Sequence, residues 1–182
     1  MRFADIRRYL KPYSIVARRT TTINHAFAAS IAPSDTFDTA AVRAAVIALG
    51  QNPDVDLVCV YCGDEAETWD HVHATVKDKA FSGHGHRLGN LLPCCKPCNS
   101  KKGNKDWRAF LGGMQLPEVQ RSERERHIEG YLTAYAVKDV VPEHLPEYQE
   151  LQEVRRQVLE LFARADKLAG IVRTKSGAIP RA

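Results

Sequence analysis

The sequence predicts an α+β fold in which a small core of short strands lies between two helical flanks. Two pairs of cysteines with C-x2-C spacing mark the middle of the chain. Between them lies a stretch that alternates in character and is rich in β-forming residues, and helical periodicity appears on both sides. We therefore divide the chain into an N-terminal cap, a core and a C-terminal extension, at residues 1–52, 53–113 and 114–182.

The N-terminal segment predicts a basic and mostly helical cap. Residues 39–49 have the pattern of a helix, which Gly50 and Pro53 would end. The chain of 182 residues has a formal net charge of +4, and all of this excess lies in residues 1–50. A basic arm can follow the phosphates of a nucleic acid. An ordinary solvated surface explains the same charge.

The five cysteines favour a metal site over disulfides. No apolar run approaches the ~20 residues of a membrane span, and the first residues do not form a secretory signal. We therefore expect the cytoplasm, where disulfides are rare. Two C-x2-C pairs supply four thiolates, the complete shell of a structural zinc ion, whereas the alternative is a set of buried thiols or one redox pair. The expected ligands are Cys59, Cys62, Cys95 and Cys98.

The remaining cysteine, Cys94, lacks the spacing of either pair, so its removal is expected to be nearly silent. Cys62 and Cys95 lie 33 positions apart, which is longer than the ~15–20 of a simple zinc ribbon and indicates an insert. A zinc ion with four protein ligands has no open position for water, so we expect it to stabilise the fold and not to catalyse.

The insert and the residues after it predict strand, loop, strand and helix. Residues 68–76 read as a strand, and the glycine-rich loop that follows contains His84 and His86, which we expect to be loop residues. A short helix is expected from Lys96 to about Gly103, and a further helical turn follows it.

The motifs CVYC, WDHVHA and LGNLLPCCKPCNSKKG resemble those of the HNH endonucleases with a ββα-metal fold and two C-x2-C zinc knuckles. The resemblance covers roughly residues 57–107 and combines several elements in one order. It implies a zinc-stapled ββα-metal nuclease core that acts on DNA, most naturally double-stranded, with Mg²⁺ or Mn²⁺ as the catalytic ion. Ala74 stands where the family often has proline, which removes no ligand.

The resemblance also implies a role for four residues. Asp70 would be a carboxylate ligand of the divalent cation, and His71 would be the general base that activates water. Asn90 would hold the histidine-bearing loop through backbone hydrogen bonds. Asn99 would be the second protein ligand, through its amide oxygen. Because Asp70 and His71 face opposite sides of a strand, they can serve one phosphate only if the strand bends or ends there.

Basic residues near these positions are candidates for contact with DNA phosphates. Three lysines follow Asn99 closely, and one arginine lies in the glycine-rich loop. Ordinary helix solvation is the alternative for the lysines. The candidates are Lys101, Lys102, Lys105 and Arg87.

The C-terminal extension predicts two helices. Residues 121–137 read as a helix interrupted at Gly130, and residues 148–172 carry an apolar seam of alternating three- and four-residue steps. The second helix either folds onto its own domain or pairs with another subunit, which would make a homodimer. The seam consists of Leu151, Val154, Val158, Leu161, Ala165, Leu168 and Val172.

The sequence therefore predicts a metal-dependent HNH endonuclease that hydrolyses DNA, of a restriction or defence type. One alternative is a zinc-stapled module that binds nucleic acid without catalysis. A binding module has no use for an acid, a base and an amide at positions 70, 71 and 99, which favours the enzyme. A second alternative is a nuclease effector that a partner protein licenses.

Overall fold

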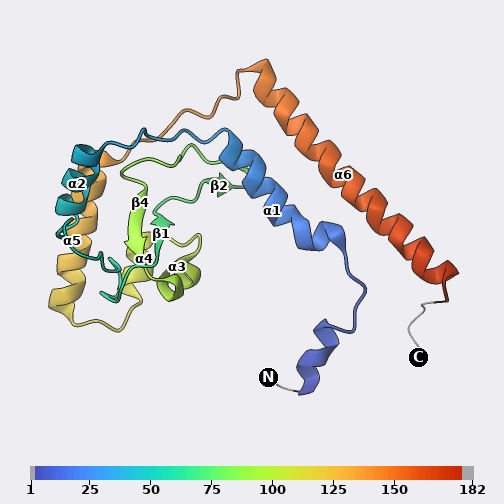
Figure 1. Ribbon diagram of the computed structural model, residues 1–182, viewed down its shortest axis with the longest axis horizontal. Helices are drawn as coiled ribbons and strands as arrows, with labels where there is room; N and C mark the ends of the chain where they lie inside the picture. Colours follow the sequence, from blue (N-terminus) through green and yellow to red (C-terminus); the bar gives the residue numbers. More distant parts are fainter. Residues whose placement is uncertain (1–2, 178–182) are drawn as a thin grey trace. The chain divides into compact units, whose positions relative to one another are not determined.

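A computed structural model describes residues 3–177 and confirms an α+β fold, mostly helical, with two small antiparallel sheets (Figure 1). The chain divides into two units, residues 28–141 and the remainder at both ends. The elements are the 3-10 helix η1 (Phe3–Arg8), the helices α1 (Ile15–Ser30) and α2 (Thr39–Ala48), the strands β1 (Thr68–His71), β2 (Val76–Lys77), β3 (Ala80–Phe81) and β4 (Leu91–Cys94), and the helices α3 (Lys96–Lys102), α4 (Trp107–Gly112), α5 (Glu118–Tyr135) and α6 (Pro146–Lys175).

The strand expected over residues 68–76 is shorter than predicted. β1 ends at His71 and pairs with β4, so that Asp70 lies opposite Leu92 and His71 opposite Leu91. The chain then turns, and β2 forms a separate hairpin with β3 through Val76 and Phe81. Asp70 and His71 would face opposite sides of a continuous strand. The end of β1 at His71 is therefore the interruption that both residues would need to serve one phosphate.

Helix boundaries agree with the local signals for starts and stops. Asp38 caps α2 because its side chain accepts the N–H of Ala41, and Asp106 caps α4 through the N–H of Ala109 in the same way. The predicted interruption at Gly130 is wrong, since α5 continues through this residue to Tyr135. Packing of α5 against α2 and α4 outweighs the unfavourable free energy of one glycine inside a helix.

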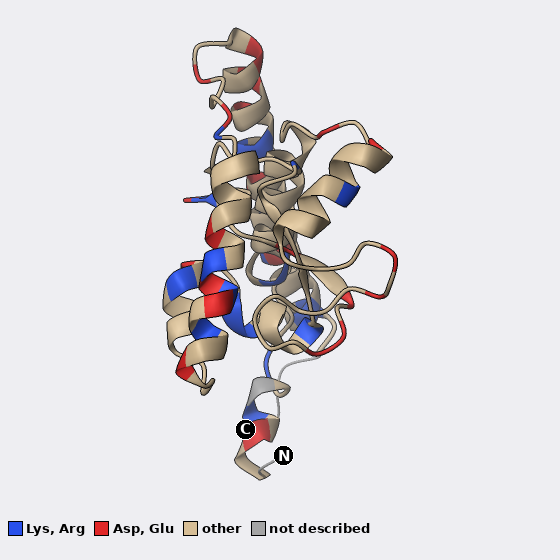
Figure 2. Cartoon of the chain, turned by 90° about the vertical axis from the view of Figure 1, so that its left-hand side faces the viewer, with Lys and Arg blue, Asp and Glu red and all other residues tan. Residues whose placement is uncertain are grey.

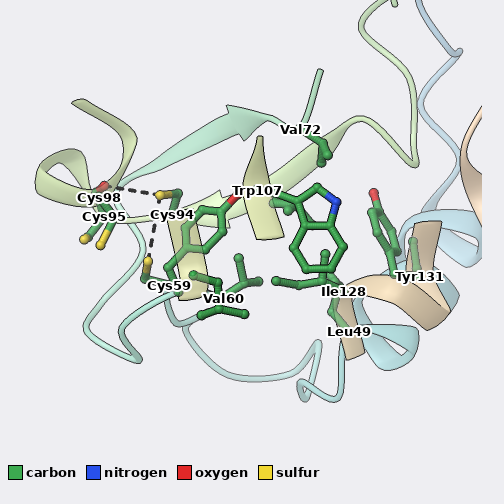
Figure 3. Close-up of a cluster of buried hydrophobic side chains, with 14 residues drawn as sticks. Leu49, Cys59, Val60, Val72, Cys94, Cys95, Cys98, Trp107, Ile128 and Tyr131 are labelled. Carbon is green, nitrogen blue, oxygen red and sulfur yellow. Dashed lines mark hydrogen bonds between the residues drawn. The ribbon is translucent and has the colours of Figure 1, made fainter. Parts of the chain in front are cut away.

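The core of the unit 28–141 lies between the sheet of β1 and β4 and the helices α2, α4 and α5. Trp107, Ile128 and Tyr131 are almost completely buried there. Figure 3 shows cysteine sulfurs at one end of this cluster, Tyr131 at the other and Trp107 between them. The exposed side of α5 carries interleaved Arg and Glu residues (Figure 2). This division between an apolar and a charged side fixes α5 against the core.

Two side chains of α5 connect it to the segments that carry the candidate site. The Tyr131 hydroxyl accepts the N–H of Gly89 at 2.7 Å and donates to the carbonyl of Leu91 at 2.9 Å. Arg124 donates to the carbonyls of Cys59 and Cys62 at 3.4 and 3.3 Å. Helix α5 therefore supports both the entry to β4 and the first cysteine pair.

Within the other unit, α6 is a helix of 30 residues that contacts the start of α1. The Asp166 carboxylate accepts the N–H groups of Ile15 and Val16 at 2.7 and 3.1 Å and the Ser14 hydroxyl at 2.8 Å. These bonds satisfy first-turn donors that have no partner within α1. Among residues 3–177, no helix combines the length and the apolar character needed to cross a bilayer.

Candidate metal centre and histidine site

The four cysteines of the two C-x2-C pairs come together in the structure. Their Sγ atoms all lie within 4.8 Å of one another, and those of Cys62 and Cys95 are 3.6 Å apart. A tetrahedral zinc ion with Zn–S bonds of about 2.3 Å places its sulfurs about 3.8 Å apart. The donor set and its spacing therefore fit one structural zinc ion, with Cys59 and Cys98 as the other two ligands.

Local backbone geometry builds this cluster. In the first knuckle, the N–H of Gly63 donates to the carbonyl of Cys59 at 2.9 Å, and Gly63 has a φ of 87° that favours glycine. In the second, Cys95 precedes the first turn of α3 and Cys98 lies within that turn. The two pairs meet because β1 and β4 are paired between them.

Cys94 lies beside the cluster and is not one of its four members. Its side chain is completely buried, and its Sγ is hydrogen-bonded to Cys59 Sγ at 3.8 Å (Figure 3). The hydrogen bond with the Cys94 thiol lowers the pKa of Cys59. Cys94 therefore favours the thiolate form that a metal requires at Cys59.

Helix α3 connects this cluster to a buried ion pair. Cys98 and Lys102 are four positions apart and occupy the same face of the helix. The ammonium group of Lys102, with a side chain only 1% exposed, lies 3.0 Å from Asp70 Oδ2, and the Asp70 side chain is 3% exposed. Lys102 is one of the three lysines that we expected to contact DNA, but its side chain is buried and points into the core.

The ion pair is enclosed by further polar groups. The Tyr61 hydroxyl donates to Asp70 Oδ2 at 2.8 Å, and Lys102 Nζ also donates to the backbone carbonyls of His71 and Val72 at 2.9 and 3.4 Å. Burial raises the pKa of Asp70, although the charge of Lys102 opposes this shift. Burial also raises the pKa of Tyr61, which stays a hydrogen-bond donor. Asp70 and Lys102 thus compensate each other in a site with little water.

His71 forms a pair with His86 at the end of β1. Its Nε2 lies 2.9 Å from His86 Nδ1, and the two rings meet edge to face with centroids 5.0 Å apart. Burial lowers the pKa of His71, and the charges of His86 and Lys102 lower it further. The neutral form of His71 is therefore favoured at pH 7.

A second histidine pair lies on the same loop. The rings of His73 and His84 are stacked with centroids 4.4 Å apart, and burial lowers the pKa of both. Asn90 holds the backbone of this region: Oδ1 accepts the N–H of His73 at 2.8 Å, and Nδ2 donates to the carbonyls of His73 and Gly85 at 3.1 and 2.9 Å. These are bonds of the kind that the HNH resemblance implies for Asn90.

The remaining predicted residues lie around this centre. Asn99 is on the first turns of α3, with Nδ2 3.4 Å from the carbonyl of Trp69. Lys101 and Lys105 are exposed, and Lys105 Nζ donates to the carbonyl of Lys101. Arg87 instead forms ion pairs with Asp35 and Asp139 at 2.8 Å, which fasten the histidine loop.

Comparison with known proteins adds no assignment. Neither a protein-family model, nor a curated protein, nor a solved structure matches the chain. The resemblance to HNH endonucleases therefore rests on the residues themselves.

Two residues of the site carried little signal in the sequence. Tyr61 lies inside the first cysteine pair, and nothing in that motif indicates that its hydroxyl donates to Asp70. His86 was expected to be only a loop residue, because nothing in a glycine-rich segment indicates which histidine returns to β1. The spacing of Cys98 and Lys102 did contain a usable signal, since residues four apart on a helix share a face.

Proposed function

We propose that residues 59–105 form a nuclease site of the HNH type that hydrolyses phosphodiester bonds of DNA. The observation that carries this proposal is the pair of His71 and His86 at the end of β1, 2.9 Å apart. Support comes from the loop that Asn90 holds and from the four-cysteine cluster at the end of the β1–β4 pair where Thr68 lies opposite Cys94.

In the proposed reaction, His71 acts as the general base. A water molecule attacks phosphorus and gives its proton to the neutral imidazole, while the bond from phosphorus to the leaving oxygen breaks. The leaving oxygen takes a proton from solvent. Contact with His86 restrains the His71 ring, and the lowered pKa of His71 keeps it able to accept a proton at pH 7.

The divalent cation that the resemblance implies does not fit the residues in this arrangement. Asp70 is buried, and its two oxygens accept hydrogen bonds from Tyr61 and Lys102. Mg²⁺ prefers to keep several of its waters, for which this carboxylate has no room. The proposed reaction therefore has no step through a metal at Asp70 and Asn99, and the exposed ammonium groups of Lys101 and Lys105 would compensate phosphate charge.

Plasmid cleavage tests the proposal. Zinc-loaded protein would be incubated with supercoiled plasmid in Mg²⁺, in Mn²⁺ and without added divalent ions, beside His71→Ala and a matched control, His144→Ala, at an exposed histidine. We expect nicked or linear DNA from the wild type and the control, and loss of cleavage in His71→Ala. Equal cleavage by both variants would contradict the assignment of His71.

A second function is favoured by the burial of Asp70, namely DNA binding without hydrolysis. The ion pair with Lys102 neutralises the one carboxylate that the HNH resemblance places at the reacting phosphate. In that case the wild type would shift a labelled DNA duplex in a gel and leave the plasmid intact under all three conditions. Loss of the shift in a Lys101→Glu, Lys105→Glu variant would show that these lysines bind the phosphates.

A further inference from the structure

Cys94 is a fifth sulfur in direct contact with the four-cysteine cluster. Its Sγ lies 3.8 Å from Cys59 Sγ, and a dashed line in Figure 3 marks this contact. The same thiol donates to the backbone carbonyl of Cys95 at 3.4 Å, which helps to hold the side chain beside Cys59. Cys94 is not one of the four cysteines whose spacing fits a zinc ion. It is therefore a free thiol that is held against one metal ligand.

The backbone around Cys59 and Cys94 would allow a disulfide bond. The N–H of Val60 donates to the carbonyl of Pro93 at 3.1 Å, so the segments that carry the two cysteines lie side by side. The two side chains point toward each other, because their sulfurs are in contact. A disulfide has an S–S length of about 2.0 Å, so the sulfurs would have to approach by about 1.8 Å. Rotations about the Cα–Cβ bonds of both residues can supply this movement.

We propose that Cys94 forms a disulfide bond with Cys59 when hydrogen peroxide oxidises the cluster, and that this bond releases the zinc ion. In the first step, the Cys59 thiolate attacks a peroxide oxygen, the O–O bond breaks, and a sulfenic acid and hydroxide form. In the second step, the Cys94 sulfur attacks the Cys59 sulfur, and its proton and the departing hydroxyl group leave as water. One peroxide molecule is reduced, and each sulfur is oxidised by one electron.

The position of Cys94 outside the metal shell favours it as the second sulfur. The other three ligands would each have to leave the ion before they could react, whereas the Cys94 thiol already touches Cys59. Zinc binds the thiolate form of cysteine, so a disulfide sulfur is a poor ligand. A structural zinc site has four protein ligands, and only three thiolates would remain. The disulfide therefore weakens zinc binding and releases the ion.

Burial controls the rate of this oxidation. Cys59 and Cys94 are both 0% exposed, so peroxide reaches them only when the cluster opens locally. Cys62 is only partly buried, which makes the first cysteine pair the side from which the cluster can open. Oxidation should therefore be slower than that of an exposed thiol. The cluster would respond to sustained exposure to peroxide and not to brief exposure.

Zinc release from the full chain tests the proposal. Zinc-loaded protein would be treated with hydrogen peroxide beside a colorimetric zinc indicator and then alkylated. Mass spectrometry with fragmentation that resolves Cys94 from Cys95 would map the disulfides. We expect one disulfide between Cys59 and Cys94 for each zinc ion released, and dithiothreitol with added zinc should restore the loaded protein. A map with disulfides only within the C-x2-C pairs would overturn the proposal, whatever the variants below show.

Two variants separate the chemistry of Cys94 from its packing. Cys94→Ala should still bind zinc, but after peroxide only a minor part of it should recover zinc in dithiothreitol. Without Cys94, the sulfenic acid on Cys59 proceeds to sulfinic acid, which dithiothreitol does not reduce. Val60→Ala is the control, because it makes a cavity in the same buried cluster and keeps all five cysteines. It should recover as the wild type does. Equal recovery in Cys94→Ala and the wild type, or equal loss in both variants, would overturn the role of Cys94.

Discussion

Replacement of Lys102 by methionine tests the buried ion pair most directly. Lys102→Met keeps most of the side-chain length and removes the charge together with the hydrogen-bond donors of the ammonium group. Asp70 then remains buried, 3% exposed, with the Tyr61 hydroxyl as its one strong donor among these groups. The carbonyls of His71 and Val72 also lose the donor that they share.

The expected loss of stability follows from these contacts. Removal of one partner from a buried pair leaves an uncompensated charge, which costs about 3–5 kcal/mol. This is a large part of the ~5–15 kcal/mol net stability of a typical domain. Lys101→Met, one residue earlier and exposed, should change the free energy of unfolding by less than about 0.5 kcal/mol.

The loss should also depend on pH. Burial raises the pKa of Asp70 above the ~3.9 of an unfolded aspartate, and loss of Lys102 removes the charge that opposes this rise. The folded protein then binds more protons than the unfolded chain between these two pKa values, so stability falls as pH rises through this window. The deficit of Lys102→Met should therefore be smaller at pH 5 than at pH 8.

Urea unfolding of zinc-loaded protein at both pH values measures these quantities. Asp70→Asn combined with Lys102→Met should lose less stability than the two single changes added together, because each single change isolates the other partner. A Lys102→Met variant that unfolds within about 0.5 kcal/mol of the wild type at pH 7, or with the same deficit at pH 5 and pH 8, would refute a buried and charged pair.

Three further predictions concern the cysteines, the loop and the histidines. Cys95→Ala should lose zinc, measured by mass spectrometry of metals, and melt far below the wild type, whereas Cys94→Ala should keep zinc and lose only about 1–2 kcal/mol from a small cavity. Asn90→Ala removes three hydrogen bonds to the loop and should cost about 2–3 kcal/mol in urea unfolding. NMR titration should place the pKa of His71 below ~6.5, and His86→Ala should raise it, because the charge of His86 lowers it. Zinc retained by Cys95→Ala would contradict Cys95 as a ligand. An unchanged free energy of unfolding in Asn90→Ala would contradict the loop hydrogen bonds, and an unchanged pKa of His71 in His86→Ala would contradict the histidine contact.

The sequence was sufficient for features that depend on local spacing. The C-x2-C pairs predicted the four sulfurs that meet, because each pair is a short turn and the zinc prediction required both pairs to lie together. The helix predicted over residues 39–49, which Gly50 and Pro53 would end, corresponds to α2. The helix α6 could likewise be predicted, because its apolar repeat follows from the periodicity of a single helix.

Features that depend on how elements meet were not predicted. Lys101, Lys102 and Lys105 lie within five residues and cannot be told apart in the sequence. Only Lys102 lies on the same face of α3 as Cys98, and its side chain is buried. Arginine is a common phosphate ligand, which made Arg87 a candidate. In the structure its guanidinium group is hydrogen-bonded to Asp35 and Asp139, which lie 52 residues before and after it in the sequence. Distant partners of this kind are fixed by the tertiary fold, which periodicity does not encode.

The hydrogen bonds from Arg124 to the first cysteine pair would make α5 sensitive to a metal ion bound by the four cysteines. Because these bonds require the carbonyls of Cys59 and Cys62 to point toward α5, any opening of the knuckle releases the guanidinium group. The same helix packs against α2 and α4, so an ion bound by the cysteines would stabilise the three helices together. Amide exchange along α5 would then quicken when a chelator removes zinc, although no residue of α5 binds the metal.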